Sequence, residues 1–173
     1  MGVDDLKAKI RDVPDFPEPG IVFKDIMPLL ADPSSLHETV GLLAEWVEPR
    51  RPDVILGAEA RGFILGAALA YKLDCGFVAA RRPGKLPWKT VSATYALEYG
   101  ENSLELHADA IDHGQRVLVH DDVLATGGTA KAICDLAGQL GGEIVGVSFV
   151  IELDFLGGRK QLEGYDVQSL IHY

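Results

Sequence analysis

The chain has 173 residues, of which 47% are hydrophobic and 24% charged, so it is too apolar for a disordered protein. Its length favours one domain with a sizeable core. The 16 Lys and Arg residues against 26 Asp and Glu residues give a net charge of −10, which argues against general affinity for nucleic acids or anionic membranes.

Neither a membrane span nor an export signal is visible in the sequence. The longest apolar runs are far shorter than the ~20 residues of a transmembrane helix, and the first residues lack the apolar stretch of a signal peptide. Cys75 and Cys134 stand alone, without a CxxC pair or a Cys/His cluster. We therefore expect a cytoplasmic protein with two reduced core thiols and neither disulfide nor structural zinc.

Apolar spacing predicts a helix that is capped by Ser34 or Ser35 and runs to about Trp46, before Pro49 and Pro52. The following elements form a predicted βαβ unit: a buried strand at 53–57, a helix at 61–73 and an apolar strand at 75–80. Later elements are an antiparallel hairpin at 94–99 and 103–108, a strand at 116–122, a helix at 128–140 and strands at 143–153 and 167–172. This alternation predicts an α/β single domain with a mostly parallel central sheet flanked by helices.

One segment of this acidic chain is purely cationic. Residues 75–97 contain no carboxylate, whereas Arg81, Arg82, Lys85 and Lys89 lie within nine residues. Such a segment suits an anionic ligand, although a solvated surface loop is an equally simple interpretation.

The segment HDDVLATGGTA, residues 120–130, follows a buried strand at the edge where parallel sheets bind ligands. Backbone N–H groups of a turn such as Ala125 to Thr129 converge on a phosphate, with the dipole of the next helix behind them. Asp121 and Asp122 are placed to accept hydrogen bonds from two vicinal hydroxyls, so the segment fits a ribose 5-phosphate. A helix-capping cluster is the alternative for the two carboxylates. The segment is neither a Walker A loop nor a GxGxxG fingerprint.

The same segment resembles the motif of a known protein family. VLVHDDVLATGGT (117–129) resembles the phosphoribosyl-pyrophosphate (PRPP) binding motif of the type I phosphoribosyltransferases. Four more segments resemble the adenine-using members of this family, in order and at the usual spacing: PDFPEPGIVFKDI (14–26), GAEARGFILG (57–66), RRPGKLP (81–87) and YALEYGENSLELHADA (95–110). The resemblance covers nearly the whole chain. It implies the type I phosphoribosyltransferase fold over residues 1–173, with a small N-terminal hood at 1–33 and a flexible β-hairpin lid at 83–106.

The resemblance implies a reaction of purine salvage: transfer of the 5-phosphoribosyl group from PRPP to N9 of adenine, giving AMP and pyrophosphate. Ribose C1 passes through an oxocarbenium-like state, so the protein mainly positions substrates and manages charge. The implied cofactor is Mg²⁺, held mainly by substrate oxygens and water rather than by protein ligands. The implied assembly is a homodimer.

Carried over residue by residue, the resemblance also implies roles for the phosphate-binding and ribose-binding residues. The 5-phosphate is assigned to Ala125, Thr126, Gly127, Gly128 and Thr129, and the ribose hydroxyls to Asp121 and Asp122. The pyrophosphate is assigned to Glu59, Ala60, Arg61, Arg81 and Lys85. The first three belong to a loop that usually contains a non-proline cis peptide, whereas Arg81 and Lys85 would reach the neighbouring subunit's site.

The adenine-binding residues implied by the resemblance are Val22, Phe23, Lys24 and Val123. The Phe23 ring would stack on the base, and the Val22 backbone would read its exocyclic amine. The implied catalytic residues are Glu98, Tyr99 and Arg61. Glu98 and Tyr99 close over the reacting centre with the lid, and Glu98 accepts or relays the adenine proton.

The sequence departs from the family pattern at three positions. Lys24 stands where Arg is common and Val123 where Leu is usual, which implies a smaller base clamp. His120 replaces an aliphatic residue, either as a satisfied strand-end histidine or as a hydrogen-bond donor behind the aspartates. Two other functions stay open. In the first, the base is a 6-oxopurine such as hypoxanthine, to which Lys24 would donate a hydrogen bond. In the second, the chain is a regulator that senses PRPP without turnover. A sensor usually carries a basic nucleic-acid-binding domain, for which this chain has no spare residues.

Overall fold

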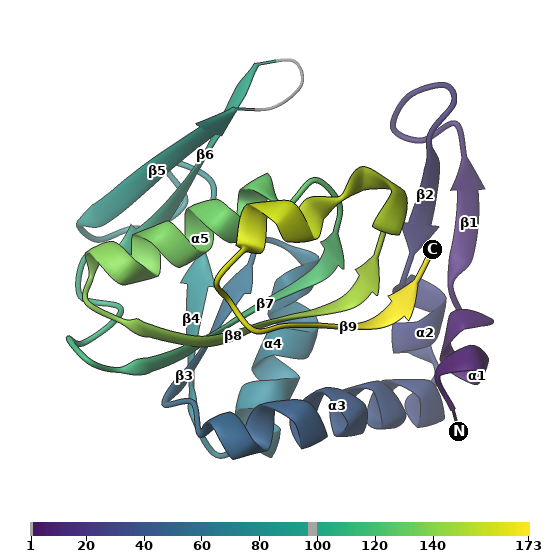
Figure 1. Ribbon diagram of the computed structural model, residues 1–173, viewed down its shortest axis with the longest axis horizontal. Coiled ribbons are helices and arrows are strands. Elements are labelled where there is room, and N and C mark those ends of the chain that lie inside the picture. The colour runs from purple at the N-terminus through teal and green to yellow at the C-terminus, as the bar shows by residue number, and fades with distance from the viewer. Residues whose placement is uncertain (1, 97–99) are drawn as a thin grey trace.

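The computed structural model describes residues 2–96 and 100–173. Five strands form its central sheet, and every pairing between them is parallel. In spatial order they are β4 (Gly76–Ala80), β3 (Val54–Ala58), β7 (Arg116–Leu124), β8 (Glu143–Glu152) and β9 (Val167–His172) (Figure 1). The predicted βαβ unit and the parallel sheet are confirmed.

Helices cover both faces of this sheet, because side chains alternate along each buried strand. Val117 and Val119 of β7 enter a core cluster beneath α5 (Gly128–Gln139), whereas Leu118 between them enters the cluster beneath α3 and α4. Helices α3 (Pro33–Val47) and α4 (Arg61–Lys72) therefore share one face. The α5 face also carries an antiparallel hairpin of β5 (Thr90–Ala96) and β6 (Glu101–His107) (Figure 1).

The N-terminal segment forms a second small sheet that the sequence did not predict. Strands β1 (Arg11–Pro14) and β2 (Val22–Asp25) pair antiparallel between α1 (Val3–Lys7) and α2 (Met27–Ala31). In Figure 1 this pair and the β5–β6 hairpin project from opposite ends of the central sheet. Short 3₁₀ turns complete the described chain at Glu48–Arg50, Asp154–Leu156 and Gly158–Leu162.

Of the predicted boundaries that differ from the structure, three have a clear local reason. The cap of α3 is Asp32, not Ser34 or Ser35: its carboxylate accepts the Ser35 N–H at 3.0 Å. The first hairpin strand begins at residue 90 rather than 94, because pairing with β6 extends back to that point. Strand β7 continues two residues past Asp122, since β8 still pairs with it there.

No helix in the described parts of the chain combines the length and apolarity that crossing a lipid bilayer requires.

Candidate active site

A cavity of about 500 Å³ opens at the carboxyl ends of β3 and β7, between the β1–β2 pair and the β5–β6 hairpin. This volume lies in the usual range for small-molecule sites. The structure brings together most residues that were predicted to bind substrate, namely Val22, Phe23, Lys24, Glu59, Ala60, Arg61, Asp121, Asp122, Val123, Ala125 and Thr129. Segments separated by a hundred residues thus form one site.

The phosphate loop (Ala125–Thr129) connects β7 to α5. Gly127 is the N-cap of α5, and no side chain of the described residues caps that helix, so its first N–H groups are available to an anion. Gly127 has φ +87°, and a Cβ there would lie 2.4 Å from the Gly158 carbonyl oxygen. Thr126 and Gly127 line a smaller hollow of about 60 Å³ beside the main cavity, which Asp121 and Thr129 also line. Because the N-cap of α5 is Gly127 and neither aspartate side chain caps this helix, the capping interpretation of the two aspartates is wrong.

The two carboxylates stand at the floor of the cavity in different environments. Asp122 is buried and forms an ion pair with Arg61 through Nε and Oδ2. Asp121 accepts the Asp122 backbone N–H at 2.8 Å through Oδ1. Burial, followed by the negative charge of Asp122, raises the pKa of Asp121 well above its ordinary value. Two adjacent acceptors of this kind suit a ligand that offers neighbouring hydroxyl donors.

Arg61 links the carboxylates to the N-terminal sheet. Its guanidinium carbon lies 4.8 Å from the centroid of the Phe23 ring, a cation–π distance. Phe16 meets the same ring edge-on at 5.3 Å between centroids. In this structure Arg61 therefore spans the predicted base-binding and ribose-binding residues, rather than standing free for an anion.

Glu59 organises the start of the cationic segment. The peptide bond between Glu59 and Ala60 is cis, as is usual for the loop that this segment resembles. The Glu59 carboxylate accepts from Arg81 Nη2 at 3.1 Å and from the Arg82 backbone N–H at 2.8 Å. The Arg82 hydrogen bond is the main cause of its lowered pKa. Arg81 also donates to the Lys85 carbonyl oxygen at 3.3 Å, and the Lys85 side chain is exposed. Arg81 and Lys85 do not line the cavity.

Tyr95 is a site residue to which the sequence analysis assigned no role. Its hydroxyl lies 2.9 Å from Thr129 Oγ1, so β5 is joined directly to the phosphate loop. The ring also covers Gly128, whose Cβ would lie 3.2 Å from Tyr95 Cδ2. The alternation of side chains along β5 could have identified Tyr95 from the sequence, because Val91, Ala93 and Tyr95 share the inward face of this strand.

His120 lies behind the site rather than in it. The side chain is fully buried and its Nδ1 lies 2.9 Å from Ser148 Oγ, while Nε2 is buried with no hydrogen-bond partner in the described residues. Burial lowers its pKa to about 4, so the imidazole is neutral at physiological pH.

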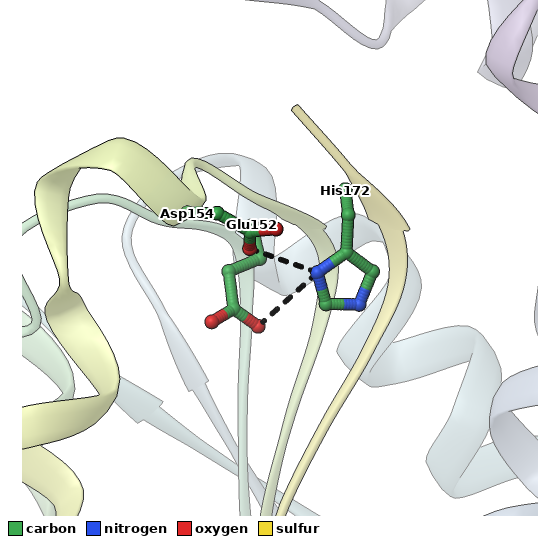
Figure 2. Close-up of side chains that lie close together, drawn as sticks. All are labelled: Glu152, Asp154 and His172. Carbon is green, nitrogen blue, oxygen red and sulfur yellow. Dashed lines mark hydrogen bonds and ion pairs between the residues drawn. The ribbon is translucent and has the colours of Figure 1, made fainter.

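The predicted catalytic residues Glu98 and Tyr99 lie outside the described residues. Within the described parts of the chain, three potential metal ligands lie close together, Glu152, Asp154 and His172 (Figure 2), and none of these lines the cavity.

Comparison with known proteins gives a consistent result. Residues 29–170 match the family described as phosphoribosyl transferase domain. A relative from Geobacter metallireducens, an adenine phosphoribosyltransferase, is 58% identical over 99% of this chain and 100% of its own length. The corresponding protein of Thermotoga maritima is 57% identical, over 98% of both chains.

Solved structures show the same likeness. The adenine phosphoribosyltransferase of Thermoanaerobacter pseudethanolicus is 51% identical, superposes with a TM-score of 0.97 and matches over 99% of both chains. The Saccharomyces cerevisiae enzyme is 38% identical with a TM-score of 0.93 over 97% of both chains. That structure is a complex with an imino-altritol bisphosphate and adenine.

Proposed function

Because this chain belongs to the phosphoribosyltransferase family, we propose that its central cavity holds both substrates of the transfer reaction. The protein transfers the 5-phosphoribosyl group from PRPP to N9 of adenine, giving AMP and pyrophosphate in purine salvage. One observation carries the assignment to this cavity. The paired carboxylates Asp121 and Asp122 stand beside the phosphate loop, at the open N-terminus of α5.

PRPP lies along the floor of the cavity in this proposal. The N–H groups of the phosphate loop bind the 5-phosphate, with the Thr126 and Thr129 hydroxyls as further donors. Asp121 and Asp122 accept hydrogen bonds from the ribose 2- and 3-hydroxyls. These hydroxyls replace Arg61 as donors to Asp122, which frees its guanidinium for the pyrophosphate.

The leaving pyrophosphate meets the loop of Glu59, Ala60 and Arg61. The Glu59 carboxylate does not itself bind the anion; its contacts to Arg81 and the Arg82 N–H fix the cationic segment. A bound Mg²⁺ would supply positive charge to the leaving pyrophosphate. The oxygen-rich cavity fits this ion, with Asp121 and Asp122 as available carboxylates and substrate oxygens and water as its main ligands.

Adenine occupies the end of the cavity that β2 provides. Phe23 stacks on the base, Val123 covers its other face and the Val22 backbone accepts from the exocyclic amine. Adenine can reach Val22 on β2, because this residue is 48% exposed. Displacement of pyrophosphate by N9 then inverts ribose C1.

The lid in this proposal spans residues 83–106 and so includes the β5–β6 hairpin except for its last residue, while residues 1–33 form a hood over the base. Closure brings in Glu98, which accepts the adenine proton, and Tyr99, which covers the reacting centre. Closure also excludes water, which would otherwise hydrolyse PRPP.

The proposed assembly is a homodimer in which Arg81 and Lys85 serve the partner's pyrophosphate. Arg81 supports this role because its guanidinium is held at the rim by Glu59 and does not line its own cavity. The test mixes two inactive variants, Arg81→Ala and the double variant Asp121→Asn/Asp122→Asn, and measures activity of verified heterodimers. Activity at one of the two sites is the expected result, and heterodimers without activity would show that Arg81 does not act in trans.

We place the protein in the cytoplasm. Both cysteines are free thiols, as expected for a reducing compartment, and burial raises the pKa of Cys134 to about 12.

Calorimetric titration of PRPP with Mg²⁺ tests the site assignment. The double variant Asp121→Asn/Asp122→Asn should weaken PRPP binding about 10- to 100-fold, because charge-assisted hydrogen bonds are lost without a change of volume. The matched control is Asp166→Asn, which breaks another Arg–Asp pair, with Arg50, away from the cavity and should leave binding unchanged. Wild-type affinity in the double variant would refute the ribose assignment.

A further inference from the structure

Lys24 lines the cavity, yet its ammonium points to two groups outside it. Its Nζ lies 2.7 Å from Asp12 Oδ1, across the β1–β2 pair, and 3.9 Å from the centroid of the Tyr173 ring. Neither Asp12 nor Tyr173 lines the cavity. The Lys24 side chain is only 13% exposed, so these contacts replace most of its contact with water. We call Lys24, Asp12 and Tyr173 the lysine latch.

Tyr173 is held firmly enough to serve as one side of this latch. Its N–H donates to the Glu152 carbonyl oxygen at 3.0 Å, and its own carbonyl oxygen accepts the Asp154 N–H at 2.9 Å. The preceding residue, His172, places Nδ1 2.9 Å from Asp154 Oδ1 and 3.9 Å from Glu152 Oε2. Figure 2 marks both contacts with dashed lines. These contacts fix the path of the chain into Tyr173.

The group of Glu152, Asp154 and His172 is better explained as an anchor for Tyr173 than as a metal site. Arg159 Nε donates to both Glu152 carboxylate oxygens, at 2.8 and 3.0 Å. A metal ion would have to compete with this guanidinium for a carboxylate that is already neutralised. We therefore assign the cluster to holding the end of β9 in place.

The Tyr173 ring is a suitable receptor for an ammonium. The ring face attracts cations, and Lys7 Nζ also lies 4.2 Å from its centroid. Burial, and next the charge of Asp12, raises the pKa of the Tyr173 phenol, so it remains neutral. Asp12 supplies the negative charge, but its side chain is 58% exposed and therefore screened by water. The ring and the carboxylate thus act together on one lysine.

The position of this ammonium matters for the choice of base. Adenine carries a hydrogen-bond donor, the amine, at position 6, whereas 6-oxopurines carry an acceptor oxygen there. A lysine ammonium only donates, so near position 6 it would favour the oxygen and oppose the amine. We propose that Asp12 and Tyr173 keep the Lys24 ammonium away from position 6, so that the lysine latch makes the site selective for adenine. This inference rests on the proposed function of the cavity.

The test compares kcat/KM for hypoxanthine and for adenine at saturating PRPP and Mg²⁺. The double variant Asp12→Asn/Tyr173→Leu releases Lys24 and should raise the hypoxanthine-to-adenine ratio about 10-fold or more, the usual effect of a hydrogen bond from a charged donor. Adding Lys24→Met to this variant should return the ratio to its wild-type value. That reversal separates the released ammonium from a general loosening of the base site.

Two controls keep the wild-type ratio if the inference is right. Tyr173→Phe retains the ring face and loses only the hydroxyl, and Asp135→Asn breaks another Lys–Asp pair, on α5, with Lys131. An unchanged ratio in the double variant, or a raised ratio that persists with Lys24→Met, would overturn the latch. Failure of the proposed function looks different, because the wild-type protein would then form no AMP from adenine.

Discussion

Replacing Gly127 with alanine adds a methyl group at the back of the phosphate loop. The residue has φ +87°, which an L side chain adopts only with strain. The new Cβ would also lie 2.4 Å from the Gly158 carbonyl oxygen and 3.0 Å from Gln161 Cβ. Because the first of these neighbours is backbone, it has no rotamer to change. The loop or the Gly158–Leu162 turn must move.

Two effects contribute to the loss of stability caused by this substitution, and alanine substitutions at two other glycines distinguish them. The left-handed conformation costs about 1 to 2 kcal/mol, and forcing a methyl group into a packed contact adds about 1 to 3 kcal/mol. Gly114→Ala, at φ +82° with nothing within 4 Å, carries only the first part. Gly138→Ala, in α5 with nothing within 4 Å, should instead stabilise the protein by about 0.5 to 1 kcal/mol.

Urea unfolding of the three variants, together with calorimetry of PRPP binding, measures both consequences. We expect Gly127→Ala to lose about 2 to 5 kcal/mol and to bind PRPP more weakly, because the moved loop misaligns its N–H donors. Gly114→Ala should lose less stability and bind PRPP normally. If Gly127→Ala matched Gly114→Ala in stability and the wild-type protein in PRPP affinity, the close packing behind the phosphate loop would be refuted.

The remaining predictions concern Tyr95, Asp121 and Glu98. Tyr95→Phe removes the hydroxyl bonded to Thr129 and should accelerate hydrogen exchange of the β5–β6 amides about 2- to 10-fold, from the loss of one hydrogen bond; Tyr165→Phe, outside the hairpin, should not. Asp121 has a raised pKa in the folded protein, so its ionisation costs stability as pH rises from the unfolded pKa through the folded one. Asp121→Asn should therefore raise Tm at pH 7, with a gain that shrinks towards pH 4; an equal gain at both pH values would contradict this assignment. Glu98→Gln should lower the single-turnover rate at saturating PRPP about 10²- to 10⁴-fold, and a rate within about threefold of wild type would assign proton transfer to another group.

The central sheet was predictable because its signals are local. β3 and β7 are short runs buried on both faces, and the turns between elements carry Gly and Pro at clear positions. The N-terminal sheet was not predictable in this way. Strands β1 and β2 have four residues each, alternate poorly, and are joined by a segment with Pro17, Pro19 and Gly20. Their pairing depends on packing rather than on a pattern.

The site was predictable where one segment carries the chemistry, as in the phosphate loop and the two aspartates before it. Contacts between distant segments were not. Nothing near Arg61 in the sequence indicates that its guanidinium meets Asp122 and the Phe23 ring. The Lys24 side chain, on β2, likewise meets the Tyr173 ring, just after β9, only in the folded chain. Side-chain direction in a site depends on such long-range contacts, which residue spacing does not encode.

A panel of purine bases tests the central claim most directly. Adenine, hypoxanthine, guanine and xanthine are each incubated with wild-type protein, PRPP and Mg²⁺, and both nucleotide and pyrophosphate are measured. We predict AMP and pyrophosphate in equal amounts from adenine and much slower reaction with the three 6-oxopurines. Binding of PRPP without turnover of any base would indicate a sensor, and faster reaction of a 6-oxopurine than of adenine would contradict the account of the base site.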